Sequence, residues 1–261
     1  MIEVVIGDVH ARPELLAALL SAVGARDSRG RRRPGFWIIQ VGDLLDRRAQ
    51  AEANLRTARL AAETLDLVLA GNHEVNMLAD PHTRHGRALT VLASRGWPQA
   101  AAEVGGWLVT HAGVHPGLTD GLPAAPGDCA VEINDRWHRR TRTGTPRQWR
   151  ASRLVGDPLF DWVGPARGGV SPYGGVFWGA ASEWPPDGRT PWGQICGHIP
   201  QTRPRLVPGP RWLIDVEAKP PRLAALVRRP RRAWAPVLVT LSARGVVLAG
   251  RFPTGKRTTG A

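Results

Sequence analysis

The chain has 261 residues, 43% of them hydrophobic, and 35 Lys and Arg against 22 Asp and Glu give it a formal net charge of +13. This length and composition fit one compact domain over residues 1–261. They exclude a membrane-spanning protein, because no apolar run approaches roughly 18 residues, and a disulfide scaffold, because only Cys129 and Cys196 are present.

The N-terminal half predicts strands that alternate with helices. Apolar runs of strand character occupy residues 2–6, 36–41 and 65–70. Helical spacing of apolar residues follows over 13–24, 50–63 and 84–94, and a further helix is expected after residue 74. This β-α-β-α-β order is typical of a layered α/β fold.

Further strands are expected in the second half, at 107–110 and 194–197, and then at 211–216, 223–227, 236–241 and 246–249. We expect the strands beyond His198 to build a second sheet against the first. The predicted fold is therefore a layered α/β/β/α sandwich of two mixed sheets flanked by helices. Residues 136–193, rich in Trp, Gly, Pro and Arg, are interpreted as an irregular insertion whose tryptophans mainly fill the core, and residues 250–261 as a frayed tail.

Three short motifs follow the first three predicted strands: GDVH from Gly7, GDLLDR from Gly42 and GNHE from Gly71. Neighbouring strands of an open α/β sheet end at one shared edge, so these motifs should meet in one crevice. Their carboxylate, imidazole and amide groups are ligands for divalent metals, and they are too many for one ion. These candidate residues are Asp8, His10, Asp43, Asn72 and His73.

Two more histidines, His111 and His198, also come directly after apolar runs. The ordered set of blocks, with HAG at His111 and QICGHIPQ around His198, resembles the calcineurin-like metallophosphoesterases. It is most similar to bacterial members of their phosphoprotein phosphatase branch, some of which cleave dinucleoside polyphosphates. The resemblance is dense over residues 1–115 and thinner over 194–216.

This resemblance implies a site for two divalent metal ions. Asp8 and His10 are assigned to one ion with His198 as its third ligand, Asn72 and His111 to the other, and Asp43 to both. Mixed oxygen and imidazole ligation without thiolate favours Mn²⁺, with Fe and Zn also suitable.

The implied reaction is hydrolysis by direct attack of a metal-bridging hydroxide, without a phosphoenzyme. His73 is the expected proton donor to the leaving oxygen, and Asp46 is expected to accept from its other ring nitrogen. Arg47 is expected to clamp two phosphate oxygens.

The chain departs from the family pattern at three positions. Ala11 and Arg48 stand where a glycine is usual, so we expect changed backbone angles there. Ala180 stands where bacterial relatives tend to carry a phosphate-binding arginine, and Arg153 or, better, Arg167 is the expected substitute. Late in the chain, Asp215 is interpreted as either a structural residue or a partner of a metal ligand.

The leading functional hypothesis is a phosphomonoesterase acting on phosphoserine or phosphothreonine in proteins. Alternatives are hydrolysis of dinucleoside polyphosphates or other small phosphate esters, and a non-catalytic phosphate- or RNA-binding protein. The basic charge suits phosphate-rich partners, but it is almost all arginine, as compositional bias would produce, so nucleic acid is possible and not favoured. Because the chain opens directly into a strand, we expect a cytoplasmic protein with no membrane partner.

Overall fold

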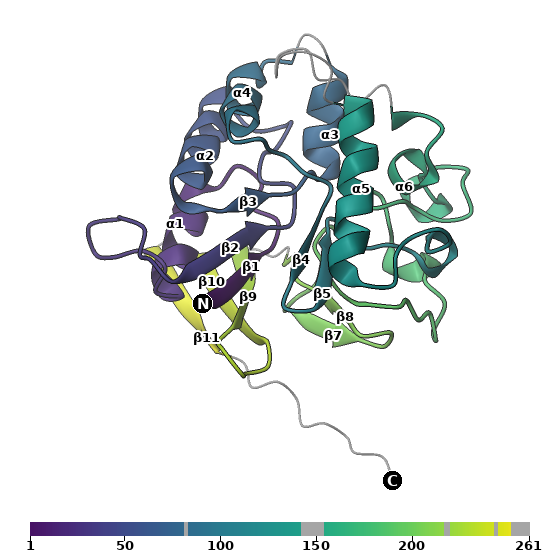
Figure 1. Cartoon of the computed structure of the whole chain (residues 1–261). Coiled ribbons are helices and arrows are strands. Elements are labelled where there is room, and N and C mark those ends of the chain that lie inside the picture. Colours follow the sequence, from purple (N-terminus) through teal and green to yellow (C-terminus); the bar gives the residue numbers. More distant parts are fainter. Residues whose placement is uncertain (81–82, 142–153, 217–219, 243–244, 252–261) are drawn as a thin grey trace.

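The computed structural model describes residues 1–80, 83–141, 154–216, 220–242 and 245–251. Within these residues two β-sheets lie face to face, and helices cover their outer faces (Figure 1). This is the predicted α/β/β/α sandwich of two mixed sheets.

The first sheet has the strand order β11-β10-β9-β1-β2-β3. Strands β1, β2 and β3 run parallel, and β9 pairs antiparallel with β1 on the other side. Helices α1 and α2 make the crossovers between the parallel strands, which therefore end at one common edge. The strands are β1 (Ile2–Ile6), β2 (Phe36–Gln40), β3 (Leu67–Val68), β9 (Arg222–Arg228), β10 (Ala235–Ser242) and β11 (Gly245–Arg251).

The second sheet has the order β4-β5-β6-β8-β7, in which β5, β6 and β8 are parallel. The carboxyl ends of these three strands carry His111, His198 and Asp215. The strands are β4 (Ala101–Val104), β5 (Trp107–Thr110), β6 (Gly193–Cys196), β7 (Arg205–Val207) and β8 (Arg211–Leu213).

Separate apolar clusters fill the space between the two sheets and the space between each sheet and the helices on its outer face. Val5, Ile39, Val109 and Ile195 belong to the cluster between the two sheets. The helices α1 (Pro13–Ala22), α2 (Ala51–Thr64) and α4 (Gly86–Ser94) pack on the outer face of the first sheet. The helices α5 (Pro126–Thr141) and α6 (Pro158–Asp161) contribute to the cluster outside the second sheet.

Helix α1 illustrates how sequence places these layers. Pro13 occupies its first turn, where no intrahelical N–H is needed, and Leu15, Leu16, Leu19 and Leu20 are fully or almost fully buried along one face. Burying each leucine contributes about 2 kcal/mol relative to exposure. This face holds α1 against the sheet and so fixes the loop that precedes it, which carries Asp8 and His10.

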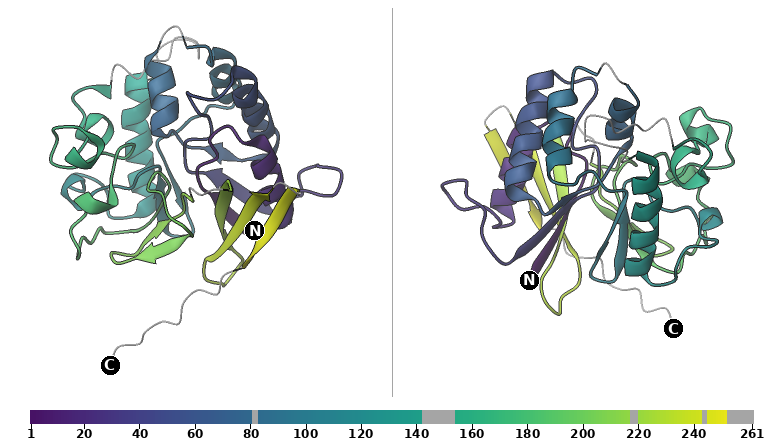
Figure 2. Two further views of the ribbon diagram at one scale, coloured as in Figure 1. Left: turned by 180° about the vertical axis from the view of Figure 1, so that it is seen from behind. Right: turned by 45° about the horizontal axis from the view of Figure 1, so that its top comes forward.

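We predicted that all strands beyond His198 build the second sheet, and this prediction is wrong. Only β7 and β8 do so, whereas β9, β10 and β11 extend the first sheet (Figure 2). The apolar runs identify these segments as strands, but the partner of a strand depends on long-range packing that its own sequence does not encode.

The insertion over 136–193 begins later than predicted, because α5 continues through Thr141. Cys129, Ile133, Trp137 and Thr141 are spaced four apart and are all buried, so the helix is amphipathic to its end. Trp137, Trp184 and Trp192 are buried, as predicted for core tryptophans, whereas Trp162 and Trp178 are only partly buried. Trp149 lies outside the described residues.

At the C-terminus, β11 includes residues 250 and 251 of the predicted tail, and the rest of that tail is outside the described part. No helix among the described residues is both long and apolar enough to cross a membrane.

Candidate metal centre and active site

The predicted metal ligands meet where the parallel strands of both sheets end. Asp8 follows β1, Asp43 follows β2, and Asn72 opens helix α3 (Asn72–Ala79) just after β3. From the second sheet, His111 follows β5 and His198 follows β6. Three groups of side chains among the described residues offer ligand atoms that lie within 4.8 Å of one another: Asp8, His10 and Asp43; Asp43, His111 and His198; and His10, Asp46 and His73. The first two, called the two ligand groups below, share Asp43, whose carboxylate lies where it could serve both.

Around His111, several nitrogen and oxygen atoms with lone pairs face one another, as the ligands of a metal ion do. His111 Nδ1 lies 3.2 Å from the carbonyl oxygen of Val41 and donates to it, which leaves Nε2 without a proton. That Nε2 lies 3.1 Å from Asn72 Oδ1 and 3.1 Å from His198 Nδ1. The Oδ2 of Asp43 is 3.6 Å from the same nitrogen.

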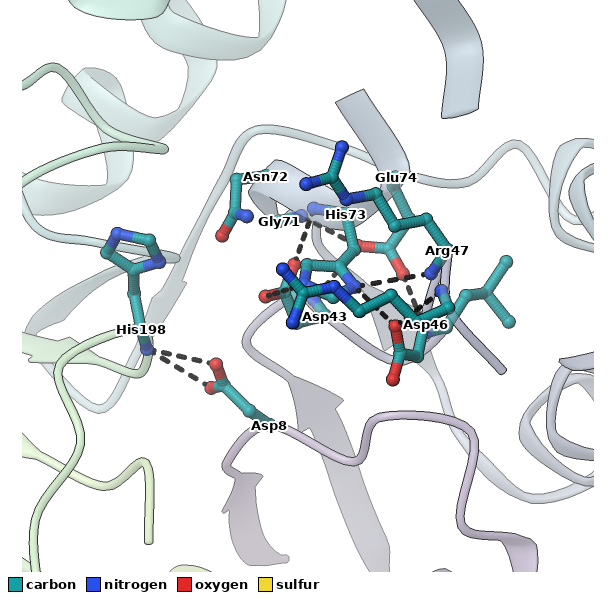
Figure 3. Close-up of polar contacts among 12 residues, drawn as sticks. Asp8, Asp43, Asp46, Arg47, Gly71, Asn72, His73, Glu74 and His198 are labelled. Carbon is teal, nitrogen blue, oxygen red and sulfur yellow. Dashed lines mark hydrogen bonds and ion pairs between the residues drawn. The ribbon is translucent and has the colours of Figure 1, made fainter. Parts of the chain in front are cut away.

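This geometry corrects the predicted assignment of His198. Its side chain joins Asp43, His111 and Asn72, whereas it was predicted to be the third ligand beside Asp8 and His10. His198 contacts Asp8 through its backbone instead: its N–H donates to Oδ2 of Asp8 at 3.0 Å (Figure 3). A strand-end histidine can reach either side of the crevice, and its rotamer is decided by the neighbours it meets there.

The electrostatics of both groups suit bound cations. Burial, followed by the charges of Asp215 and Asp43, raises the pKa of the Asp8 carboxyl well above its usual value. Burial and the charge of Glu74 likewise raise the pKa of Asp43. Carboxylates buried side by side repel one another, and a divalent cation between them removes that cost.

The histidines are correspondingly held neutral, which a metal ligand requires. Burial first, and then the charge of His73, lowers the pKa of His10 to about 4. Burial and then the charge of Arg167 lower the pKa of His198 to about 3. Its Nε2 is buried and makes no hydrogen bond among the described residues. The donor set of carboxylate, amide and neutral imidazole therefore fits a pair of divalent ions.

Backbone strain is concentrated at this site. Five non-glycine residues of the described chain have positive φ, and four of them belong to the centre or flank it: His10, Ala11, Asp43 and His198. Each such conformation costs on the order of 1–3 kcal/mol and persists only where surrounding contacts enforce it. Ala11 keeps a left-handed φ of 55°, so at this position the chain accepts strain where glycine would relieve it.

Two glycines let the backbone approach the ligands. A Cβ atom on Gly71 would overlap Oδ1 of Asp43, and one on Gly197 would overlap Oδ1 of Asp8. Both glycines immediately precede a predicted ligand, Asn72 or His198. Any larger residue at either position would displace a carboxylate from the centre.

Glu74, the last residue of the GNHE block, holds the two motif loops together and was not predicted to have a role. It is fully buried, and its Oε2 accepts from the backbone N–H groups of Asp43 and Gly71, both at 2.9 Å. Its Oε1 accepts from Leu45 N–H at 2.8 Å. Charge-assisted bonds of this kind contribute about 1.5–3 kcal/mol each. The signal that reveals Glu74 is its position, the third residue of α3, where a carboxylate can cap the helix.

His73 and Asp46 form the predicted pair. Nδ1 of His73 is 3.2 Å from Oδ1 of Asp46, and the His73 backbone N–H donates to Asp43 at 2.8 Å. Burial lowers the pKa of His73, but the bond to Asp46 and the charges of Asp43 and Glu74 outweigh it and raise that pKa above its usual value. Burial also opposes ionisation of Asp46, yet hydrogen bonds from His73 and from Arg48 N–H lower its pKa to about 2. The bond to Asp46 thus orients the His73 ring and favours its protonated form.

The loop that carries Asp46 and Arg47 is fixed by two buried residues that were not predicted to take part. Asn54 Oδ1 accepts from Asp46 N–H, and its Nδ2 donates to the Asp46 carbonyl, both at 2.8 Å. The same Nδ2 lies 3.0 Å from Nδ1 of His85, whose Nε2 lies 3.1 Å from the Arg47 carbonyl. His85 is buried, and it supports this loop.

Around Ala180, the predicted substitute arginine lies next to the centre. Arg167 ends the short 3-10 helix Pro165–Arg167, and its Nη2 donates to the backbone carbonyl of His198 at 3.1 Å. Glu183 holds this turn by accepting from Ala166 N–H at 3.1 Å. Arg153, the other candidate, lies outside the described residues. Asp215 is buried, and its charge raises the pKa of Asp8, so it neighbours the first ligand group.

The fold and these motifs have counterparts among known proteins. A family model described as calcineurin-like phosphoesterase matches residues 4–228. A solved structure of a cold-active protein tyrosine phosphatase is similar with a TM-score of 0.59 and 15% sequence identity, over 92% of this chain and 74% of that chain. At this identity the similarity shows the fold alone. A comparison with curated proteins found no match.

Proposed function

The chain belongs to the calcineurin-like phosphoesterases, metal-dependent hydrolases that bind two metal ions, and from this premise we propose that it cleaves phosphomonoesters of phosphoserine and phosphothreonine in proteins. The observation that carries the proposal is the His73–Asp46 pair beside the ligand groups. An alkoxide is a poor leaving group until it receives a proton, so a held imidazolium is what an alkyl phosphate needs. In this reading the chain acts in the manner of the phosphoprotein phosphatase branch.

The geometry supports the following proposed roles. Asp8, His10, Asp43, Asn72, His111 and His198 hold the metal ions. Two bound divalent ions supply a water of lowered pKa and positive charge beside the phosphoryl oxygens. His73 gives its Nε2 proton to the leaving oxygen while Asp46 keeps Nδ1 protonated and the ring oriented. Arg47, whose side chain makes no hydrogen bond or ion pair among the described residues, is available to clamp the phosphate.

Hydrolysis of a dinucleoside polyphosphate is the second candidate. It is favoured by the arginines that surround the site, Arg47 and Arg167, because they suit a substrate with several phosphate groups. The same proton donor would serve it less critically, since a phosphate leaving group departs without full protonation. The two candidates therefore differ in their dependence on His73.

A substrate panel tests the proposed function. The protein is freed of metal with a chelator, supplied with Mn²⁺, and assayed on a phosphopeptide, a dinucleoside tetraphosphate and p-nitrophenyl phosphate. We expect activity only after Mn²⁺ is added, with the highest kcat/KM for the phosphopeptide, and we expect Fe or Zn to support lower or equal rates. A higher kcat/KM for the dinucleotide would favour the second candidate, and inactivity on all three with each metal would refute a phosphoesterase.

Replacing Arg167 tests the proposed second phosphate clamp. Arg167→Gln should raise KM about three- to tenfold with little change in kcat, because the contact would bind ground state and transition state equally. Arg189→Gln removes another exposed arginine, for which no contact with the site is found, and its KM should stay at the wild-type value. An unchanged KM in Arg167→Gln, with both metals still bound, would show that Arg167 serves only to hold the His198 carbonyl.

A further inference from the structure

The third group of candidate ligands includes the proposed proton donor itself. One ligand atom each from His10, Asp46 and His73 lies within 4.8 Å of the other two. His73 Nδ1 and Asp46 Oδ1 are 3.2 Å apart (Figure 3), and the His10 ring stands edge-on to the His73 ring with 5.1 Å between their centroids. Two imidazoles and a carboxylate from three separate segments of the chain therefore face one another.

These three side chains are open to solvent and have lone pairs to offer. All three are partly exposed, whereas Asp43, His111 and His198 of the second ligand group are buried. Oδ1 of Asp46 accepts from Arg48 N–H and contacts His73, and no described residue bonds to its Oδ2. Likewise, no described residue hydrogen-bonds to the His10 ring. An ion from solvent could therefore reach this group and find unused lone pairs there.

The donor set of this group suits Zn²⁺ better than Mn²⁺. Zn²⁺ is commonly held by three histidine or carboxylate ligands and a water, at about 2.0–2.2 Å from each. Tetrahedral ligands at that distance lie about 3.4 Å from one another. The atoms of His73 and Asp46 already have nearly this spacing. For the same nitrogen and oxygen ligands, Zn²⁺ also binds more tightly than Mn²⁺.

An ion at this group should bind more weakly than the two central ions. His10 also belongs to the first ligand group, with Asp8 and Asp43, so one side chain is claimed by two ions. Cations bound at the two ligand groups would in addition repel a third one nearby. We therefore expect the third ion to bind only when Zn²⁺ is in excess, and dialysis without zinc to remove it.

Binding at this group would disable the proposed proton donor. A free His73 can carry protons on both ring nitrogens and give one of them to the leaving oxygen. A metal-bound imidazole keeps at most one N–H, and losing that proton would leave an imidazolate, so the bound ring is a far weaker acid. Asp46, which orients the ring, would face the ion at the same time.

We propose that excess Zn²⁺ fills the group of His10, Asp46 and His73 as a third ion and inhibits the enzyme by taking its proton donor. Zinc thereby regulates the site that it can also serve, with two ions active and three inactive. The inhibition rests on the proposed function, whereas the binding of the third ion does not, so the two are measured separately.

Counting bound ions tests the third position without any substrate. The full-length protein is equilibrated by dialysis against buffers of rising free Zn²⁺ concentration, and zinc per chain is measured by mass spectrometry. We expect the wild type to bind two ions at low free Zn²⁺ and a third at higher concentration. His73→Ala and Asp46→Ala each remove one of the three ligands and should stop at two. A wild type that stops at two would overturn the proposal.

A matched variant and a second metal serve as controls for this count. His138→Ala removes a histidine that belongs to none of the three groups, so it should bind three zinc ions like the wild type. Mn²⁺ should give no more than two ions at the concentration where Zn²⁺ gives three. If His73→Ala binds as many zinc ions as His138→Ala at every concentration, the extra ion lies elsewhere and the proposal is wrong.

The rate of hydrolysis shows whether the third ion inhibits. On a phosphoserine peptide, kcat/KM of the wild type and of His138→Ala should fall by up to roughly 10²-fold over the range of free Zn²⁺ in which the third ion binds. A rate that stays constant while the third ion binds would overturn the inhibition. If no phosphoester is hydrolysed with any metal, the proposed function fails, and the ion count still decides whether the third position exists.

Discussion

Asp43→Asn should abolish activity and metal binding together while the fold stays intact. Asp43 is 2% exposed and belongs to both ligand groups, so among the described residues its carboxylate is the side chain on which both ions would depend. A loss of metal charge worth about 4 kcal/mol at the transition state lowers the rate by about 10³-fold, and losing both ions should exceed this. The measurements are kcat/KM on the best substrate of the panel and the metal content after dialysis.

The same variant should be at least as stable as the wild type when metal is absent. The amide can still accept from His73 N–H through Oδ1, and its NH₂ group would face His111 Nε2, where the carboxylate Oδ2 now faces a lone pair. The substitution also removes a buried charge whose pKa is raised by burial and by Glu74. Differential scanning calorimetry in chelator should therefore give an equal or higher Tm than the wild type.

Added Mn²⁺ distinguishes the two proteins. Metal at 100 times its Kd stabilises the wild type by about 2.7 kcal/mol, and this stabilisation should vanish in Asp43→Asn. Asp135→Asn, an exposed change of the same kind on α5, should keep both the activity and the rise in Tm. A fully active Asp43→Asn, or one that still gains stability with Mn²⁺, would contradict the bridging role.

The sequence predicted the elements of this site better than their arrangement. The motif loops could be predicted because Asp8, Asp43 and Asn72 follow parallel strands, and parallel strands end at one edge. Which sheet the later strands join could not be predicted, since β9 pairs with β1 through contacts more than 200 residues apart in the chain. For the same reason the sequence did not show that the side chain of His198 faces His111.

The supporting residues were missed because their roles arise only in three dimensions. Asn54 lies on α2 and His85 precedes α4, and neither belongs to a motif, yet together they bond both Asp46 and Arg47. A helical asparagine and a loop histidine carry no signal by themselves. Glu74 does belong to a motif, but its contribution is to bind backbone N–H groups, which the residue type alone cannot distinguish from catalysis.

His73→Asn should separate metal binding from chemistry. The asparagine keeps the backbone N–H that donates to Asp43, so the loop and both ligand groups should remain in place. The ring that pairs with Asp46 is lost, and with it the proton for the leaving oxygen. The rate on an alkyl phosphate such as a phosphoserine peptide should fall by roughly 10²–10⁴, the usual contribution of a positioned general acid.

The leaving group provides the internal control for this variant. p-Nitrophenolate departs without full protonation, so hydrolysis of p-nitrophenyl phosphate should fall far less than that of the phosphopeptide. Metal content should equal that of the wild type, which matters because His73 also lies within ligand distance of His10 and Asp46. If one metal were lost, His73 would be a ligand in that third group. If both substrates lost activity equally with both metals retained, the imidazole would act on the phosphoryl group itself, and the proton would reach the leaving oxygen from another donor.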